Sequence, residues 1–91
     1  MQFANFLESK VCEKDISINR LSNETGVSRK SIYRWLAGEK YPDAKNVIAI
    51  GSILELDSKD TSMMLQCWIK DKELQEIIKL YLDTTLLVTL N

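Results

Sequence analysis

Apolar residues recur at spacings of three and four along most of this chain, and short polar segments or glycines interrupt them. Such spacing places apolar side chains on one face of an α-helix. It predicts five helices, over residues 2–13, 18–25, 29–37, 43–54 and about 63–82. Residues that commonly cap helices stand at several of the expected ends, namely Ser17, Ser28 and Asp43 at starts and Gly26 and Gly38 at ends.

The apolar faces of the first, fourth and fifth predicted helices define much of the expected core. They comprise Phe3, Phe6, Leu7 and Val11, then Ala44, Val47, Ile48, Gly51 and Leu54 with Ile50 beside them, then Met64, Trp68, Ile78, Tyr81 and Leu82. Polar residues 70–73 interrupt the last stripe, which leaves open whether it is one helix or two. Residues 84–91 are rich in β-branched and aliphatic side chains, and a strand, a helix end or an intermolecular arm all fit them.

Residues 18–38 have the spacing of two helices packed at a steep angle across a short turn. This geometry needs an inward residue, a small residue at the helix contact, a turn glycine, a residue that fills the space under the turn, and two inward residues three apart. The sequence supplies these with Leu21, Ser22, Gly26, Val27, Ile32 and Trp35, in that order. The pattern predicts a helix-turn-helix.

The outward face of the second helix in this motif then carries Arg29, Lys30, Tyr33 and Arg34. An α-helix fits the major groove of DNA, where arginine can bond two acceptors of guanine and the first residues of a recognition helix reach base edges. Tyr33 either touches a thymine methyl or a sugar, or covers Val27 on the surface. Trp35 is expected in the core.

The 91-residue chain has a net charge of −1, but its positive charge is concentrated. Residues 28–45 hold five basic and two acidic residues, whereas the segments on either side are both net acidic. A local basic segment favours nucleic acid as the partner of that segment alone. Lys40 and Lys45 are candidates for contacts with phosphates.

Composition excludes several classes of site. The absence of histidine removes Ser-His-Asp and Cys-His catalysis and the common zinc sites, and the three isolated glycines form no phosphate loop. We therefore expect no enzyme, cofactor or metal. Cys12 and Cys67 are expected as two buried thiols, with a disulfide left open.

The chain shows no sign of membrane insertion or export. No apolar run approaches the ~20 residues that cross a bilayer, and the first residues lack the basic region of a signal peptide. We expect a cytoplasmic protein.

With these residues in place, the sequence resembles the phage-repressor family (Cro/cI-type, XRE-like) over about residues 3–57. The match includes Leu21, Ser22, Gly26, Val27, Ser28, Ile32, Trp35, Gly38 and Pro42 and continues through residues 53–57. The resemblance implies an all-α, lambda-repressor-like bundle of five helices whose third helix contacts DNA. It also implies that the loop at residues 39–41 meets phosphates. The candidate DNA-binding residues are Asn19, Ser28, Arg29, Lys30, Ser31, Tyr33, Arg34, Lys40, Tyr41 and Lys45.

The sequence departs from the family at three positions. Ile18 stands where a glutamine often grips the DNA backbone, Ser22 where alanine is usual, and Leu36 where glutamate is usual. Asn19 or Arg20 is the expected substitute for the missing glutamine.

These observations predict a DNA-binding domain at residues 1–57 and a C-terminal helix and tail at 58–91 that belongs to the same compact domain. Because the resembled domain closes its core with four helices, the later apolar residues either pack back on it or form a homodimer seam, which we favour. Such a dimer of a transcriptional regulator, with repression the expected outcome, would bind a near-palindromic operator in double-stranded DNA. The alternative is an antitoxin-like interaction module whose C-terminal region binds another protein.

Overall fold

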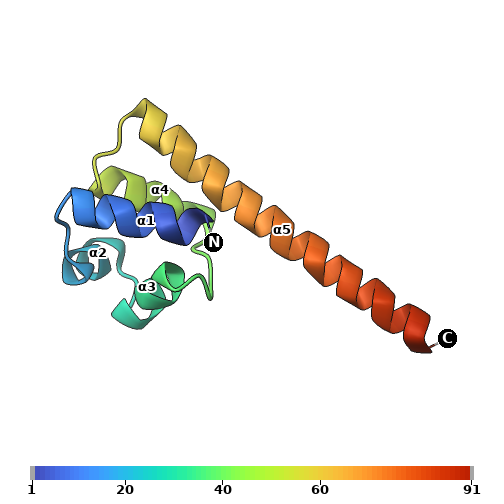
Figure 1. The fold of residues 1–91 in the computed structure, drawn as a ribbon. Coiled ribbons are helices and arrows are strands. Elements are labelled where there is room, and N and C mark those ends of the chain that lie inside the picture. The colour runs from blue at the N-terminus through green and yellow to red at the C-terminus, as the bar shows by residue number, and fades with distance from the viewer. Residues whose placement is uncertain (1, 91) are drawn as a thin grey trace.

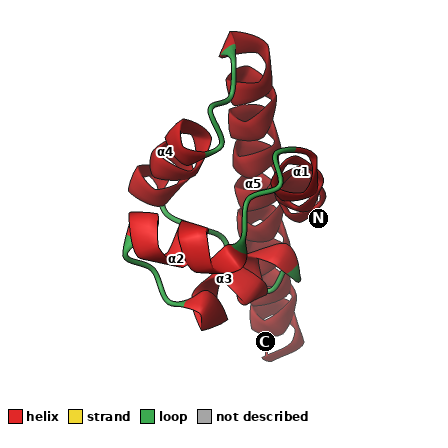
Figure 2. Cartoon of the chain, turned by 90° about the vertical axis from the view of Figure 1, so that its left-hand side faces the viewer, coloured by secondary structure: helices red, strands yellow, loops and turns green. Residues whose placement is uncertain are grey.

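The computed structural model describes residues 2–90 of the backbone and the side chains of residues 2–83. It contains five α-helices and, within residues 2–90, no strand (Figures 1 and 2). They are α1 (Gln2–Glu13), α2 (Ile18–Thr25), α3 (Arg29–Leu36), α4 (Ala44–Ile53) and α5 (Ser58–Leu90). The all-α, five-helix prediction is confirmed.

Local side-chain chemistry explains where α2, α3 and α4 begin. Ser17, Ser28 and Asp43 each accept a hydrogen bond from the backbone N–H three residues later, at 3.0, 3.2 and 2.9 Å. This bond satisfies one of the amides that a helix start leaves unpaired. Gly26 follows α2 with φ of 75°, and its N–H donates to the carbonyl of Ser22. The caps predicted at Ser17, Ser28, Asp43 and Gly26 are confirmed, whereas the C-cap of α3 is Ala37 and Gly38 follows it with φ of 75°.

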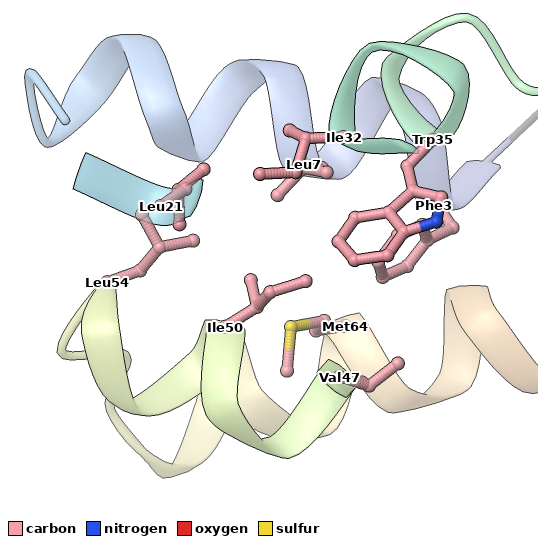
Figure 3. Packing of buried hydrophobic residues seen from close by; sticks show 9 residues of the cluster. All are labelled: Phe3, Leu7, Leu21, Ile32, Trp35, Val47, Ile50, Leu54 and Met64. Atoms are coloured by element: carbon pink, nitrogen blue, oxygen red, sulfur yellow. The ribbon is translucent and has the colours of Figure 1, made fainter. Parts of the chain in front are cut away.

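All five helices contribute to one hydrophobic core (Figure 3). Its buried members are Phe3 and Leu7 of α1, Leu21 of α2, Ile32 and Trp35 of α3, Val47 and Ile50 of α4, Leu54 after α4, and Met64 of α5. Four helices therefore do not close this core alone, because Met64 is 1% exposed within it.

The expected inward stripe of α4 was wrong in part. Ile48 is 66% exposed, and Ala44 is exposed as well, whereas Ile50 is buried. The buried positions 47, 50, 51 and 54 follow the three-and-four spacing of one helix face. One residue advances about 100° around a helix, so Ile48 lies well away from Val47.

Helix α5 is longer than predicted at both ends. It starts at Ser58 rather than after residue 62, and it continues without a break through residues 70–73. Of the alternatives left open for residues 84–91, the structure has helix through Leu90; Asn91 lies outside the described residues. The strand is therefore not formed.

The outer half of α5 extends beyond the other helices (Figure 1). A helix of 33 residues spans about 50 Å. The radius of gyration is 15.5 Å, against about 12 Å for a compact chain of this length. Large apolar side chains on this extension are exposed, including Leu74, Ile77, Ile78, Leu80, Tyr81 and Leu82.

A buried carboxylate marks the point where α5 leaves the domain. Asp71 is 5% exposed, and its Oδ2 accepts from the N–H of Phe3 at 2.8 Å while its Oδ1 accepts from that of Gln2 at 3.3 Å. A negative charge is favourable at a helix N-terminus, where unpaired amides carry partial positive charge. At the start of α5, Asp60 pairs with Lys10 of α1 at 3.0 Å. Residues 58–71 are thereby attached to α1 at two points.

The expectation of two buried thiols was wrong for Cys12, which is exposed. Cys12 follows the half-buried Val11 and lies off the face of α1 that buries Phe3 and Leu7. Cys67 is half-buried, and burial raises its pKa above the ordinary value, which disfavours the reactive thiolate. Both are free cysteines.

Replacing Asp71 should weaken the attachment of α5 to α1. Asp71→Ala leaves two amides without their acceptor and is expected to lower the free energy of unfolding by about 2–3 kcal/mol. Asp71→Asn keeps an acceptor but removes the charge, so it should cost about half as much. Urea denaturation measures both, with the exposed Glu73→Ala on the same helix as the matched control. An alanine variant as stable as the wild type would contradict this role.

Candidate nucleic-acid interface

The turn between α2 and α3 is held by side chains as well as by Gly26. The hydroxyl of Ser22 donates to the carbonyl of Val27 at 2.7 Å. The hydroxyl of Thr25 accepts from the N–H of Val27 at 3.2 Å and donates to the carbonyl of Leu21 at 2.6 Å. Sequence reasoning assigned Ser22 only a small size and assigned Thr25 no role. Both satisfy backbone groups of a partly buried turn.

Packing orients α3. Ile32 and Trp35 are 1% and 5% exposed in the core, as expected from their spacing. The opposite face of α3 is then the solvent face. Tyr33 is 57% exposed on it.

The solvent face of α3 and the residues just after it line one open depression on the surface. We call it the α3 face, and its residues are Ser28, Arg29, Lys30, Tyr33, Arg34, Ala37 and Glu39. Three cations and one carboxylate lie on it. The structure thus brings together five of the predicted site residues: Ser28, Arg29, Lys30, Tyr33 and Arg34. A sixth, Ser31, is partly buried beside them and accepts a hydrogen bond from the hydroxyl of Ser28.

Asn19 of α2 lies next to this face. Its Oδ1 accepts a hydrogen bond from a guanidinium N–H of Arg29 at 3.1 Å. Arg20, the other expected substitute for the family's glutamine, instead forms an exposed ion pair with Glu24 at 3.2 Å. Of the two, Asn19 is therefore the one that the structure places beside the α3 face.

The loop between α3 and α4 separates two of the predicted residues. Lys40 is exposed, one residue after Glu39 of the α3 face. Tyr41 is partly buried and lines a groove with α5, next to Asp71. Burial, together with the negative charge of Asp71, raises the pKa of Tyr41 above its ordinary value of 10.0. Tyr41 thus lies apart from the α3 face.

Lys45 is exposed near the start of α4. It does not line the depression on the α3 face.

Other kinds of site find no support in the described part of the chain. Among these residues, no three histidine, cysteine or acidic side chains are grouped as metal ligands would be. Nor does any described helix combine the length and apolar character that a bilayer-crossing segment needs.

Comparison with protein families agrees with this geometry. A family model described as helix-turn-helix matches residues 7–59, more than half of the chain. The chain belongs to this phage-repressor-like (XRE-type) family of DNA-binding regulators, which is typically non-enzymatic. In comparisons with curated proteins and with solved structures, nothing matches.

The turn glycine provides a test of how the motif is built. A Cβ at Gly26 would meet no atom within 4 Å, but φ of 75° is unfavourable for residues with a Cβ. Gly26→Ala should therefore lower the free energy of unfolding by about 1–2 kcal/mol. Gly26→Asn should cost less, since asparagine tolerates this conformation better. Equal losses in urea denaturation would show that backbone strain is not the cause.

Proposed function

We propose that this protein is a sequence-specific transcriptional regulator, acting as a repressor, that inserts α3 into the major groove of double-stranded DNA. One observation carries the proposal: Arg29, Lys30 and Arg34 share the α3 face, and none is engaged by an acid. Within residues 2–83, the ion pairs involve only Lys10 and Arg20 as cations. The cations of α3 are therefore available to a negatively charged partner.

The shape of the α3 face supports a duplex rather than a small molecule. The depression is shallow and open, whereas small-molecule sites are enclosed clefts. An arginine in the major groove can bond O6 and N7 of guanine together, which discriminates this base by about 1–3 kcal/mol. Arg29, Lys30 and Arg34 are the proposed base-reading residues. Ser28, Asn19 and Lys40 are proposed to contact phosphates and to set the position of the helix.

Repression follows from occupancy of an operator that overlaps a promoter. Among the described residues, no group of histidine, cysteine or acidic side chains could hold a metal ion that would add chemistry to binding. Selection of bound sequences from a random duplex library tests the proposal. We expect one enriched palindromic motif, with affinity that falls steeply as salt rises because bound phosphates release counterions. Failure to bind any duplex at low salt would refute the proposed function.

The regulator acts as a homodimer through the outer half of α5. Met64, Asp71 and Ile78 are spaced by seven residues, so the face that is buried in the first half of α5 continues beyond the domain. There, Leu74, Ile78 and Leu82 line a groove, each about half exposed. Monomeric proteins rarely expose a contiguous apolar surface, so this surface favours contact with another chain.

The charges of this groove suit a second copy as the occupant. Its charged lining residues are Lys72, Lys79, Asp71, Glu76 and Asp83. Asp71 is buried and bound to the start of α1, so the exposed charges are two bases and two acids, and two copies of the face do not repel each other. A two-fold dimer presents two α3 helices to a palindromic operator, with half-sites one DNA turn of about 34–36 Å apart or a multiple of it.

Two substitutions separate base reading from phosphate contact. Arg34→Ala should weaken binding to the selected operator by about 1–3 kcal/mol and leave binding to unrelated duplexes nearly unchanged. Lys40→Ala should weaken all duplexes alike and flatten the dependence of affinity on salt. Fluorescence anisotropy over a salt series measures both effects. Lys59→Ala, which removes one charge from the start of α5, is the control and should bind as the wild type does.

Equal losses on operator and unrelated DNA for Arg34→Ala would show that Arg34 does not read a base.

A single charge in the α5 groove should abolish the dimer. Ile78→Lys places two cations in the same seam, and the variant should run as one chain of 10.5 kDa in sizing with light scattering, where the wild type has twice this mass. Leu80→Lys is the matched control: Leu80 is also exposed but lies off the groove, so this variant should stay dimeric.

A wild type that is monomeric at concentrations that saturate the operator would contradict the homodimer. It would favour the second candidate function, in which the exposed face of α5 binds a different protein.

A further inference from the structure

The loop between α3 and α4 has to hold Lys40 in place for the phosphate contact proposed above. Its first residues are tied to α3: the N–H groups of Glu39 and Lys40 donate to the carbonyl of Arg34 at 3.0 and 3.4 Å. Its last residue, Asp43, caps α4. Tyr41 and Pro42 lie between the residues bonded to α3 and the residue that caps α4. The path of the loop therefore depends on what holds its middle.

Trp68, which is 26 positions away in the sequence, holds the middle of the loop at Pro42. The carbonyl of Pro42, the only hydrogen-bonding backbone group that a proline has, accepts from the indole N–H of Trp68 at 2.8 Å. Pro42 is buried and Trp68 is partly buried, so solvent replaces this bond poorly. In Figure 1 the loop runs beside α5, the helix that carries Trp68.

Neighbours on α5 keep the indole in place. The ammonium of Lys72 lies 4.5 Å from the centre of the Trp68 ring, a cation–π contact. One turn of helix beyond Trp68, Asp71 anchors α5 to the start of α1. Trp68 thus lies on a helix that Asp71 anchors to α1, and the indole N–H of Trp68 holds the loop.

We propose that Trp68 is a positioning residue for DNA binding, which holds the loop so that Lys40 reaches a phosphate. The proposal rests on the function proposed above and extends it to a residue of α5. A packing role alone would require only the ring of Trp68. The positioning role requires its N–H, and this difference makes the two roles separable.

Two variants remove the N–H and keep an aromatic ring. Trp68→Phe retains a ring for packing and for Lys72. Chemical synthesis of the 91-residue chain with benzothienylalanine at position 68 retains the fused ring and replaces the N–H by sulfur. The second variant keeps the side-chain volume, so it stays informative if the phenylalanine variant fails to fold. Leu65→Ala, a half-buried position on the same helix, controls for lost packing.

The readout is the slope of the logarithm of DNA affinity against the logarithm of salt concentration, measured at a temperature where every variant is folded. Loss of one phosphate contact should reduce the magnitude of this slope by about 0.9. In the proposed homodimer each variant removes one contact per subunit, so we expect a reduction of about 1.8 for both Trp68 variants and for Lys40→Ala. The double variant Trp68→Phe with Lys40→Ala should behave as Lys40→Ala alone, because the two changes remove the same contact. Leu65→Ala should keep the wild-type slope.

A wild-type slope and affinity for the Trp68 variants would overturn the proposal, and so would effects of Trp68→Phe and Lys40→Ala that add. A wild-type protein that binds no duplex would instead refute the proposed function itself. The two failures are therefore distinct.

Discussion

Burial of Ile32 and Trp35 is the constraint on which the rest of this molecule depends. The two side chains are three residues apart on a helix of eight, so their burial decides which way α3 faces. Arg29, Lys30 and Arg34 lie on the opposite face of α3 as a consequence, and Arg29 is held there by Asn19 as well. Gly26 and the hydroxyls of Ser22 and Thr25 add a turn that lets α3 cross α2 and reach this core.

Helix α5, in the second half of the chain, supports the core and the loop beside the α3 face. Helix α5 adds Met64 to the core, binds the start of α1 through Asp71 and binds the α3–α4 loop through Trp68. Past Asp71, residues 72–83 are all exposed, and the apolar face of the helix continues along them. One helix thus supplies part of the core, a support for the loop beside the α3 face, and the proposed dimer surface.

Local patterns predicted most of the fold. The bounds of α1 and α2 and the caps at Ser17, Ser28 and Asp43 rest on neighbours within four residues, and such signals are visible in a sequence. The start of α5 was missed although a signal was present: Asp57 accepts from the N–H of Asp60 at 2.8 Å, as an N-cap does. The bonds of Asp71 to Phe3 and of Trp68 to Pro42 join residues 68 and 26 positions apart, which no local spacing encodes. The same limit applies to the candidate site, since spacing grouped the residues of the α3 face correctly but not Tyr41, whose position depends on contact with α5.

The central claim is that the α3 face is the surface that meets DNA, and amide chemical shifts of the labelled full-length protein test it most directly. On titration with the selected operator duplex, the account predicts the largest shift changes at residues 28–34 and 39–40 and at Asn19. The outer half of α5 should change little, because the proposed dimer forms there before DNA is bound. Changes confined to residues 72–83, with the α3 face unaffected, would contradict the account.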